Sequence, residues 1–394
     1  EAAIARNPDI AIAVARVREA RAQETLARAQ LFPTLDASAG ATHGRSVNPF
    51  GQAVEGTSAQ PLVQTAYEVD LFGRVDDQVS AARSAWLASE AARDAARLSV
   101  AAATASGYVT LLALDARRDV VRDTIAARGE SLRIARSRSD AGYTSQLELR
   151  QAEAEYEAAR LILPQVELAV TRQENALRLL AGDVPGAVAR GGSLATLIAP
   201  PLPDQGLPPE LLRRRPDIAQ AELMLAASDA TLSAARKQFL PSVRLTAAAG
   251  AVFNSALPDP ITIWSAGGSV LAPLFEGGRL RAGVETAAAR RDQAAFAYRK
   301  TALTAFREVD DALAGVASLG RQRTIAEAQR AAIADALRHA GNRYRAGYSS
   351  YLEELDAQRA LLSADLGLVQ LRADQMNALI ALYQALGGGW SPRP

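Results

Sequence analysis

The same pattern occurs twice along this chain of 394 residues. The segment RAGYSSYLEELDAQRA (345–360) closely repeats DAGYTSQLELRQAEAE (140–155), and NPDIAIAVARV from Asn7 is answered by RPDIAQAELML from Arg215. Matching segments follow in the same order at nearly constant spacing, which indicates an internal structural repeat. We therefore predict two repeats separated by a linker rich in Gly and Pro, with the ranges 1–182, 183–209 and 210–394.

Each repeat predicts the same order of elements: helix, two strands, long helix, break, helix. In the first copy we expect a helix from Pro8 to Gln30, which Pro33 ends, and a long helix over 76–138. The second long helix is expected over 280–345. Neither long segment contains proline, and at 1.5 Å per residue each makes a rod of roughly 90 Å. A compact globule has no need of such a rod.

The last helix carries two apolar seams whose residues are spaced alternately three and four apart, as in coiled coils. One runs from Leu352 to Tyr383 and the other from Ala357 to Ala385. They lie about 150° apart around the helix, so we expect a neighbouring helix on each side, as in the wall of a tube. Two strips of the helix surface lie between the seams. One contains both polar and apolar residues, among them Leu379 and Leu386, and the other is a polar stripe: Glu353, Asp356, Ser363, Gln370, Asp374, Asn377 and Gln384.

Such a polar stripe fits the lumen of a tube, although the solvated face of an ordinary bundle helix is the alternative. In the helix after the first break, Pro164 predicts a kink or the end of a segment.

The extended segments alternate between apolar and polar residues. We expect strands over 34–43, 62–72 and 261–272, and a further strand in which Val243 and Leu245 begin the apolar face. Alternation over about ten residues is typical of outer-membrane strands. Four strands are too few to close a barrel, for which about eight is the minimum. If they enter a membrane, several chains must share one barrel; the alternative is a small soluble sheet.

Composition excludes several other functions. The net charge is +1, which favours no nucleic-acid partner, and the chain has no cysteine and only His43 and His339. The apolar segment 98–114 is shorter than the roughly 20 residues of a membrane-spanning helix, so we expect a buried helix. The FEGGRLRAG segment lacks the spacing of phosphate-binding loops. We therefore expect no catalytic or metal site, no cofactor and no enzymatic activity.

Five longer motifs resemble those of one known family. They are GLPPELLRRRPDIAQAE, YEVDLFGRV, FLPSVRLTAAAG, APLFEGGRL and the terminal ALGGGW. The chain resembles, over essentially its whole length, the outer-membrane efflux factors, the TolC-like channels of tripartite pumps in Gram-negative bacteria. It is most similar to the lipoprotein branch associated with multidrug exporters. In this branch a signal sequence and a lipid-carrying cysteine precede the first repeat, and lipidation of the native protein stays open.

The resemblance implies a mainly α fold with a small β part. In this family, long helical hairpins form a trimeric α-helical barrel across the periplasm, and four strands per chain contribute to a shared twelve-stranded outer-membrane β-barrel. The implied partners are two further copies of the chain, outer-membrane lipid, a periplasmic adaptor protein and an inner-membrane pump. The implied function is a passive conduit from periplasm to exterior. A soluble or peripheral coiled-coil scaffold that binds partners through its hairpin tips is the alternative.

The resemblance also assigns roles to the residues around the two breaks. Both breaks become hairpin turns at the periplasmic end, where the family narrows to an iris-like gate. Glu353 and Asp356 match acidic rings around the closed mouth, and Tyr344 matches a tyrosine that bonds to the neighbouring hairpin, with Glu148 as its acceptor. The turn residues match positions that meet the adaptor: Ala141, Gly142, Tyr143, Ala346, Gly347 and Tyr348.

Overall fold

The computed structural model describes residues 1–198, 213–255 and 258–390. Part of the predicted linker, from 199 onward, therefore lies outside the described residues. Two short elements accompany the repeats, helix α1 (Ala2–Arg6) and the 3-10 turn η1 (Leu194–Thr196).

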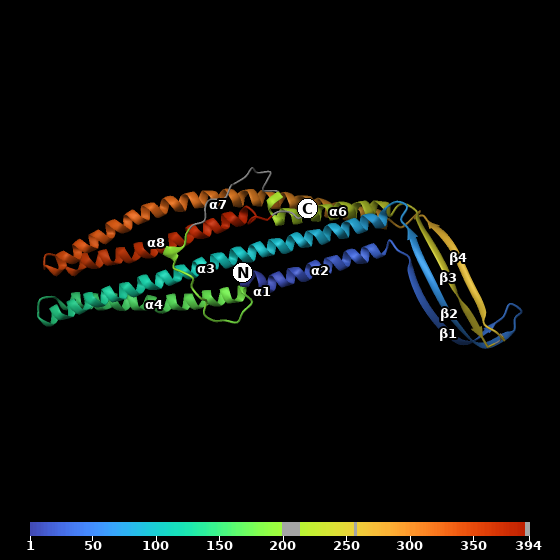
Figure 1. Cartoon of the computed structure of the whole chain (residues 1–394), viewed down its shortest axis with the longest axis horizontal. Coiled ribbons are helices and arrows are strands. Elements are labelled where there is room, and N and C mark those ends of the chain that lie inside the picture. The colour runs from blue at the N-terminus through green and yellow to red at the C-terminus, as the bar shows by residue number, and fades with distance from the viewer. Residues whose placement is uncertain (199–212, 256–257, 391–394) are drawn as a thin grey trace. The chain divides into compact units, whose positions relative to one another are not determined.

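The described elements repeat in order, and the helices also repeat in length (Figure 1). The three helices of the first copy have 22, 67 and 35 residues, and those of the second copy have the same lengths. The first copy comprises α2 (Pro8–Ala29), β1 (Thr34–Val47), β2 (Ala53–Val69), α3 (Arg74–Asp140) and α4 (Gln146–Leu180). The second comprises α6 (Pro216–Lys237), β3 (Ser242–Asn254), β4 (Ile261–Leu271), α7 (Arg279–Arg345) and α8 (Tyr351–Ala385). The predicted two-fold repeat is confirmed.

The boundaries of two elements differ from expectation. Helix α4 continues through Pro164 to Leu180, so the predicted end of a segment there is wrong, and the alternative of a kink stays a prediction. Strand β1 extends to Val47 and strand β2 begins at Ala53, so both are longer than predicted.

Helix α3, which contains the segment 98–114, has an 18-residue window apolar enough to cross a membrane by length and composition, and 28% of that window is buried. One such window is weak evidence for a span.

The four strands form one antiparallel sheet in the order β1-β2-β3-β4. Residues directly opposite each other in an antiparallel sheet share a face. Val63 pairs with Ala249, Tyr67 with Leu245, and Ala249 with Trp264. This register confirms the predicted apolar face of β2 and β3 and fixes the phase of β4. We call this side of the sheet the apolar face.

The residues group into two compact units, and each unit draws on both repeats. One unit comprises 1–13, 93–216 and 302–394, and the other comprises 14–92 and 217–301 with the whole sheet. The repeat boundaries at 182 and 210 remain a prediction about the chain's internal symmetry.

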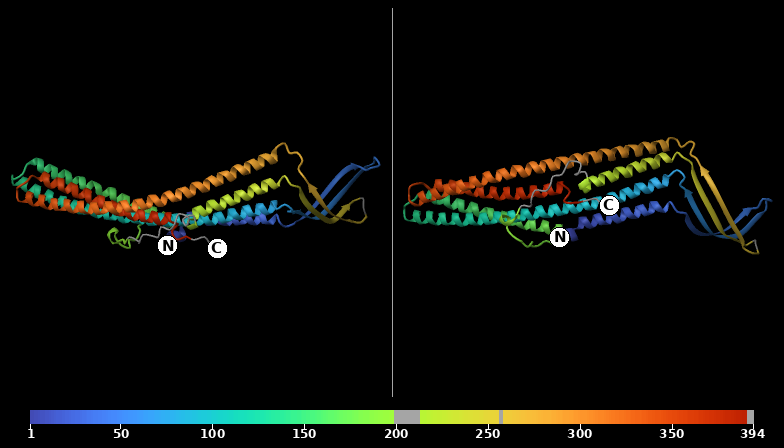
Figure 2. Two further views of the ribbon diagram at one scale, coloured as in Figure 1. Left: turned by 90° about the horizontal axis from the view of Figure 1, so that it is seen from above. Right: turned by 45° about the horizontal axis from the view of Figure 1, so that its top comes forward.

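In the first unit, α3 packs beside α4 and α7 beside α8 (Figures 1 and 2). Ala373 and Met376 from the first seam of α8 pack with α3 residues, whereas Leu382 and Ala385 from the second seam pack with Val309 of α7. The expected neighbour on each side of α8 is confirmed. Leu379 and Leu386, placed in the mixed strip, are also buried in these clusters.

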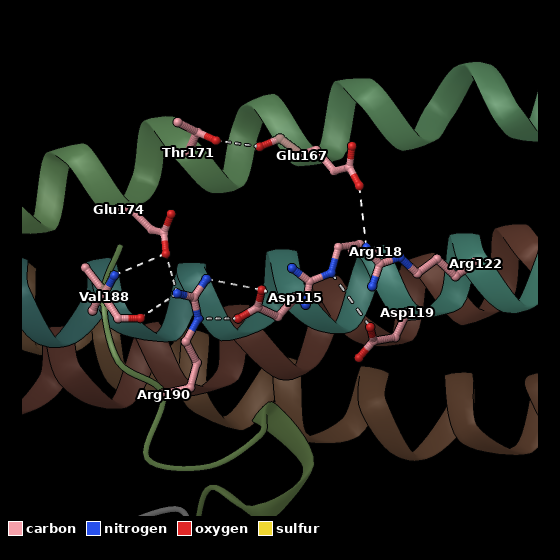
Figure 3. A network of polar contacts seen from close by, with 9 residues as sticks. All are labelled: Asp115, Arg118, Asp119, Arg122, Glu167, Thr171, Glu174, Val188 and Arg190. Atoms are coloured by element: carbon pink, nitrogen blue, oxygen red, sulfur yellow. Dashed lines mark hydrogen bonds and ion pairs between the residues drawn. The ribbon is translucent and has the colours of Figure 1, made fainter. Parts of the chain in front are cut away.

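The residues after α4 form a strap, which we define as 183–198, and Arg190 fastens it to the helices (Figure 3). Its guanidinium donates two hydrogen bonds to Asp115 of α3, at 2.8 and 3.3 Å, and another to Glu174 of α4. The Val188 backbone N–H donates to the same Glu174 carboxylate at 3.2 Å. One strap side chain thus joins the two helices of the first hairpin.

Apolar contacts extend the strap to the second hairpin. Leu194 is buried in a cluster with Leu112 of α3 and Met376 of α8. The Gly191 N–H donates to the Tyr108 hydroxyl at 2.8 Å. Burial of an apolar side chain of this size contributes about 2 kcal/mol, so the strap helps to hold α8 against α3.

We predict that Arg190→Met lowers the free energy of unfolding by about 3 kcal/mol, because it leaves the Glu174 carboxylate, 14% exposed, without its cation. The Asp115 carboxylate keeps Arg118 at 3.2 Å. Arg122→Met is the matched control: Arg122 contacts Glu167 at 3.5 Å in an exposed pair worth at most about 1 kcal/mol. Denaturant unfolding followed by circular dichroism measures both. Equal losses in the two variants would contradict this account of the strap.

The contact between Arg190 and Glu174 also makes the stability of the protein depend on pH. Burial raises the pKa of Glu174, but hydrogen bonds from Arg190 and from the Val188 N–H outweigh it, and the pKa is lowered. The stabilisation is therefore present above the ordinary pKa of a glutamate and is lost as pH falls through the lowered value. We expect the difference between wild type and Arg190→Met to shrink in acid.

Candidate functional site

The two breaks between helices fold as the same turn. Gly142 and Gly347 have φ of +72° and +78°, a left-handed conformation that glycine adopts without strain. The following N–H groups, of Tyr143 and Tyr348, donate to helix carbonyls five residues earlier at 2.8 and 2.9 Å. A serine then starts the next helix. The duplicated AGYTS and AGYSS segments thus encode a helix stop followed at once by a helix start.

All six predicted contact residues lie on the surface of these turns. Tyr143 is 86% exposed and Tyr348 is 81% exposed. A large exposed aromatic side chain at a turn tip presents apolar area and a hydroxyl to a partner. The others are also exposed: Ala141, Gly142, Ala346 and Gly347.

Tyr344 and Glu148 meet beneath the turns. Tyr344 is 3% exposed, and its ring lies 5.6 Å from that of Tyr351, which is 1% exposed. Neither hydroxyl has a hydrogen-bond partner among the described residues. Glu148 instead accepts a hydrogen bond from the Thr144 hydroxyl. The structure therefore brings the predicted pair close enough for the Glu148 carboxylate to act on the Tyr344 hydroxyl within a single chain.

The surroundings keep both tyrosines neutral. Burial raises the pKa of Tyr344 well above its ordinary value, and the Glu148 carboxylate raises it further. Burial also raises the pKa of Tyr351, to about 12, with a contribution from the Glu354 carboxylate. Desolvation disfavours the charged phenolate, and nearby negative charges act in the same direction. The two rings therefore serve as neutral packing groups throughout the physiological range.

A second polar contact joins three helices near the turns, and the sequence pattern did not predict it. Arg128 of α3 is buried, and its guanidinium lies 2.9 Å from the Glu155 carboxylate of α4. Arg359 of α8 donates to the same carboxylate, with Nε at 3.0 Å. Glu155 thus ties the first hairpin to the second. A signal was available, because Arg359 occupies a seam position among leucines, where a charge needs a partner.

Arg138 links the ends of the two long helices. It lies at the end of α3, and its guanidinium donates to the carbonyls of Tyr344 and Arg345 at 3.2 and 3.0 Å. The same group lies 4.6 Å from the centre of the Tyr344 ring. A cation at a helix C-terminus satisfies free carbonyls and stabilises the helix dipole.

Glu353 and Asp356 are exposed in the single chain. Glu353 lies 3.6 Å from Arg343, and Asp356 lies 3.9 Å from Arg359, so both ion pairs are loose. Glu353 and Asp356 are the first residues of the polar stripe of α8. Three stripe residues further along are exposed as well: Ser363, Gln370 and Gln384. The stripe therefore has no protein neighbour within the described part of the chain along much of α8.

The described residues contain no group of three His, Asp or Glu side chains placed to hold a metal ion. His43 lies on β1 beside Thr57, at 3.0 Å, and His339 is exposed on α7. The chemistry at the turns is thus that of packed aromatics, ion pairs and an exposed acidic stripe.

Long helical hairpins with a small sheet of alternating polarity define a class of membrane-associated channel proteins. A family model for outer membrane efflux proteins matches residues 1–183 and 207–388. The solvent efflux pump outer membrane protein SrpC of Pseudomonas putida is 35% identical over 405 residues, covering 99% of this chain and 84% of the relative. The pyoverdine export outer membrane protein OpmQ of Pseudomonas aeruginosa is 33% identical, covering 98% and 84%.

Solved structures agree with these relatives. The outer-membrane channel OprN superimposes with a TM-score of 0.93 at 29% identity, covering 100% of this chain and 89% of that one. The chain belongs to the outer membrane efflux protein family. It is an outer-membrane channel component of an efflux system, and its family consists of transport channels rather than enzymes. The alternative of a soluble scaffold is not favoured.

The buried tyrosines generate a prediction at alkaline pH. Because the folded-state pKa of Tyr351 is raised to about 12, its contribution to stability is complete below the ordinary tyrosine pKa and is lost as pH rises toward 12. We expect Tyr351→Phe to show a smaller fall in the unfolding midpoint between about pH 10 and 12 than wild type. The control Tyr348→Phe, at an exposed ring, should leave the fall unchanged. An identical fall in Tyr351→Phe would contradict the burial argument.

Proposed function

We propose that three copies of the chain form a passive conduit from periplasm to exterior, closed at the helical turns by an iris-like gate. The observation that carries the proposal is the exposed polar stripe of α8, which begins with Glu353 and Asp356 beside the turns. A stripe of this kind lines a water-filled lumen at low cost, because its groups keep their hydration.

Open edges in both parts of the molecule support assembly with further copies. Within the described residues, β1 pairs only with β2, and β4 pairs only with β3. An open edge is costly in a membrane, where unpaired backbone groups lack water. Helix α4 also carries exposed leucines at one heptad position, separated by fourteen and seven residues and without a partner in the described part of the chain: Leu147, Leu161 and Leu168.

The gate acts through charge and packing. In a trimer, Glu353 and Asp356 would supply six carboxylates to a narrow mouth, which favours cations and impedes anions. In the closed state the Glu155 ion pairs and the packing of Tyr344 hold the two hairpins together. Opening requires these contacts to separate or slide.

The turns are the proposed contact with a periplasmic adaptor protein, which connects the conduit to an inner-membrane pump. The exposed rings of Tyr143 and Tyr348 provide the largest apolar area at the two tips. The small residues beside them permit a partner helix to approach closely. Small polar groups along the lumen provide little selectivity, so the pump chooses the cargo, and the conduit itself performs no catalysis.

The charge of the gate is tested in planar bilayers. We expect the double variant Glu353→Gln and Asp356→Asn to lose much of the wild-type preference for cations, measured as the reversal potential in a salt gradient. The control double variant Glu157→Gln and Asp335→Asn removes the same charge from exposed positions outside the stripe.

The control should retain the wild-type reversal potential. A gate variant whose reversal potential equals that of wild type would refute the placement of the acidic residues in the pore. A channel without any cation preference in the wild type would refute the electrostatic gate altogether.

A further inference from the structure

The apolar face of the sheet ends at a defined level. From Val69 to Ala59, every second residue of β2 and its partners on β1, β3 and β4 is predominantly apolar. Ten steps at about 3.4 Å, tilted by about 40°, span a height of roughly 26 Å. That height matches the apolar band of about 25 Å on outer-membrane barrels. Large side chains on it are exposed: Leu35, Val63, Leu245, Phe253, Trp264 and Val270.

Aromatic residues lie near both limits of this band. Tyr67 lies toward the end where the strands join the helices, and Phe253 pairs with Ala59 at the other limit. Trp264, 79% exposed, lies on the same face near the middle of the band, because it pairs with Ala249, which pairs with Val63. Tyr67 and Phe253, near the two limits, match the aromatic girdles at the two interfaces of a membrane. In the proposed trimer the limit remote from the helices lies at the outer interface.

The β1–β2 hairpin continues past this level, and two polar pairs follow on the same face before the apolar pair of Val47 and Ala53. Beyond Ala41 and Ala59, the next pairs on the apolar face are His43 with Thr57 and Arg45 with Glu55. His43 lies 3.0 Å from the Thr57 hydroxyl and 3.6 Å from the Glu55 carboxylate. Glu55 lies opposite the exposed Arg45 in the ladder, but no ion pair of Arg45 occurs within the described residues.

We infer that Arg45, with His43 beside it, binds phosphate groups of outer-leaflet lipid headgroups. The inference rests on the proposed function, because it requires the strands to lie in a shared barrel. The guanidinium lies on the lipid-facing side, just beyond the apolar band, which is the level of the headgroups. A guanidinium binds phosphate through paired, charge-assisted hydrogen bonds. Each basic residue near an anionic surface adds about 1 kcal/mol, or a roughly fivefold preference.

The test uses Trp264 as a reporter of the bilayer, in a background where Phe replaces the other two tryptophans, Trp86 and Trp390. Protein is reconstituted into vesicles of brominated phosphatidylcholine mixed with phosphatidic acid, and the quenching of tryptophan fluorescence gives the relative binding of the two lipids. We expect wild type to prefer phosphatidic acid by up to about fivefold, Arg45→Gln to lose most of that preference, and Arg45→Lys to retain part of it. Inorganic phosphate in the buffer should not remove the preference.

The control is Arg244→Gln, which makes the same change in charge on the opposite face of the sheet, where Arg244 pairs with Glu68. It should keep the wild-type preference. If Trp264 in Arg45→Gln is quenched as in wild type and the variant still prefers phosphatidic acid, the inference about Arg45 is overturned. The proposed barrel is not contradicted by that result. Loss of the preference on addition of inorganic phosphate would instead mark a site for the free ion. Failure of brominated lipid to quench Trp264 would overturn the barrel itself.

Discussion

The outer edges of the four-stranded sheet constrain everything else in this protein. Strands β1 and β4 each leave one row of backbone N–H and C=O groups unpaired within the described residues. In lipid such groups have no water to bond with, and only a closed ring of strands satisfies them. One chain has too few strands to close the ring, so in the proposed trimer further copies complete it. The apolar face of about 26 Å then has a bilayer to contact.

The helices must also cover their apolar surfaces, and they do so by packing against neighbouring helices. Helix α8 needs a neighbour on each side, and the chain supplies α3 and α7. Helix α4 keeps exposed leucines for which the described part of the chain supplies no partner. Contacts between hairpins, through Glu155 and the strap, set how far the hairpins can separate. These contacts combine ion pairs at Glu155 with apolar packing around Leu194 and around Tyr351.

Much of this architecture could be predicted from the sequence, because periodicity reports the surroundings of each residue. The turn segments around Gly142 and Gly347 and the apolar phase of β2 and β3 followed from local pattern alone. The outer part of β1 could not, since apolar alternation stops at His43 while the strand continues. The bonds of Arg190 and Glu155 were also missed, because long polar side chains carry no periodic signal and their partners lie far away in the sequence.

The stoichiometry of the barrel is the most direct test. The mass of the purified protein in detergent, measured by light scattering with the detergent contribution subtracted, should be three times 41.6 kDa, about 125 kDa. Removal of the detergent should precipitate it, because the apolar face then meets water. A stable, soluble monomer of 41.6 kDa in plain buffer would contradict the account, since its four strands would have no barrel to complete.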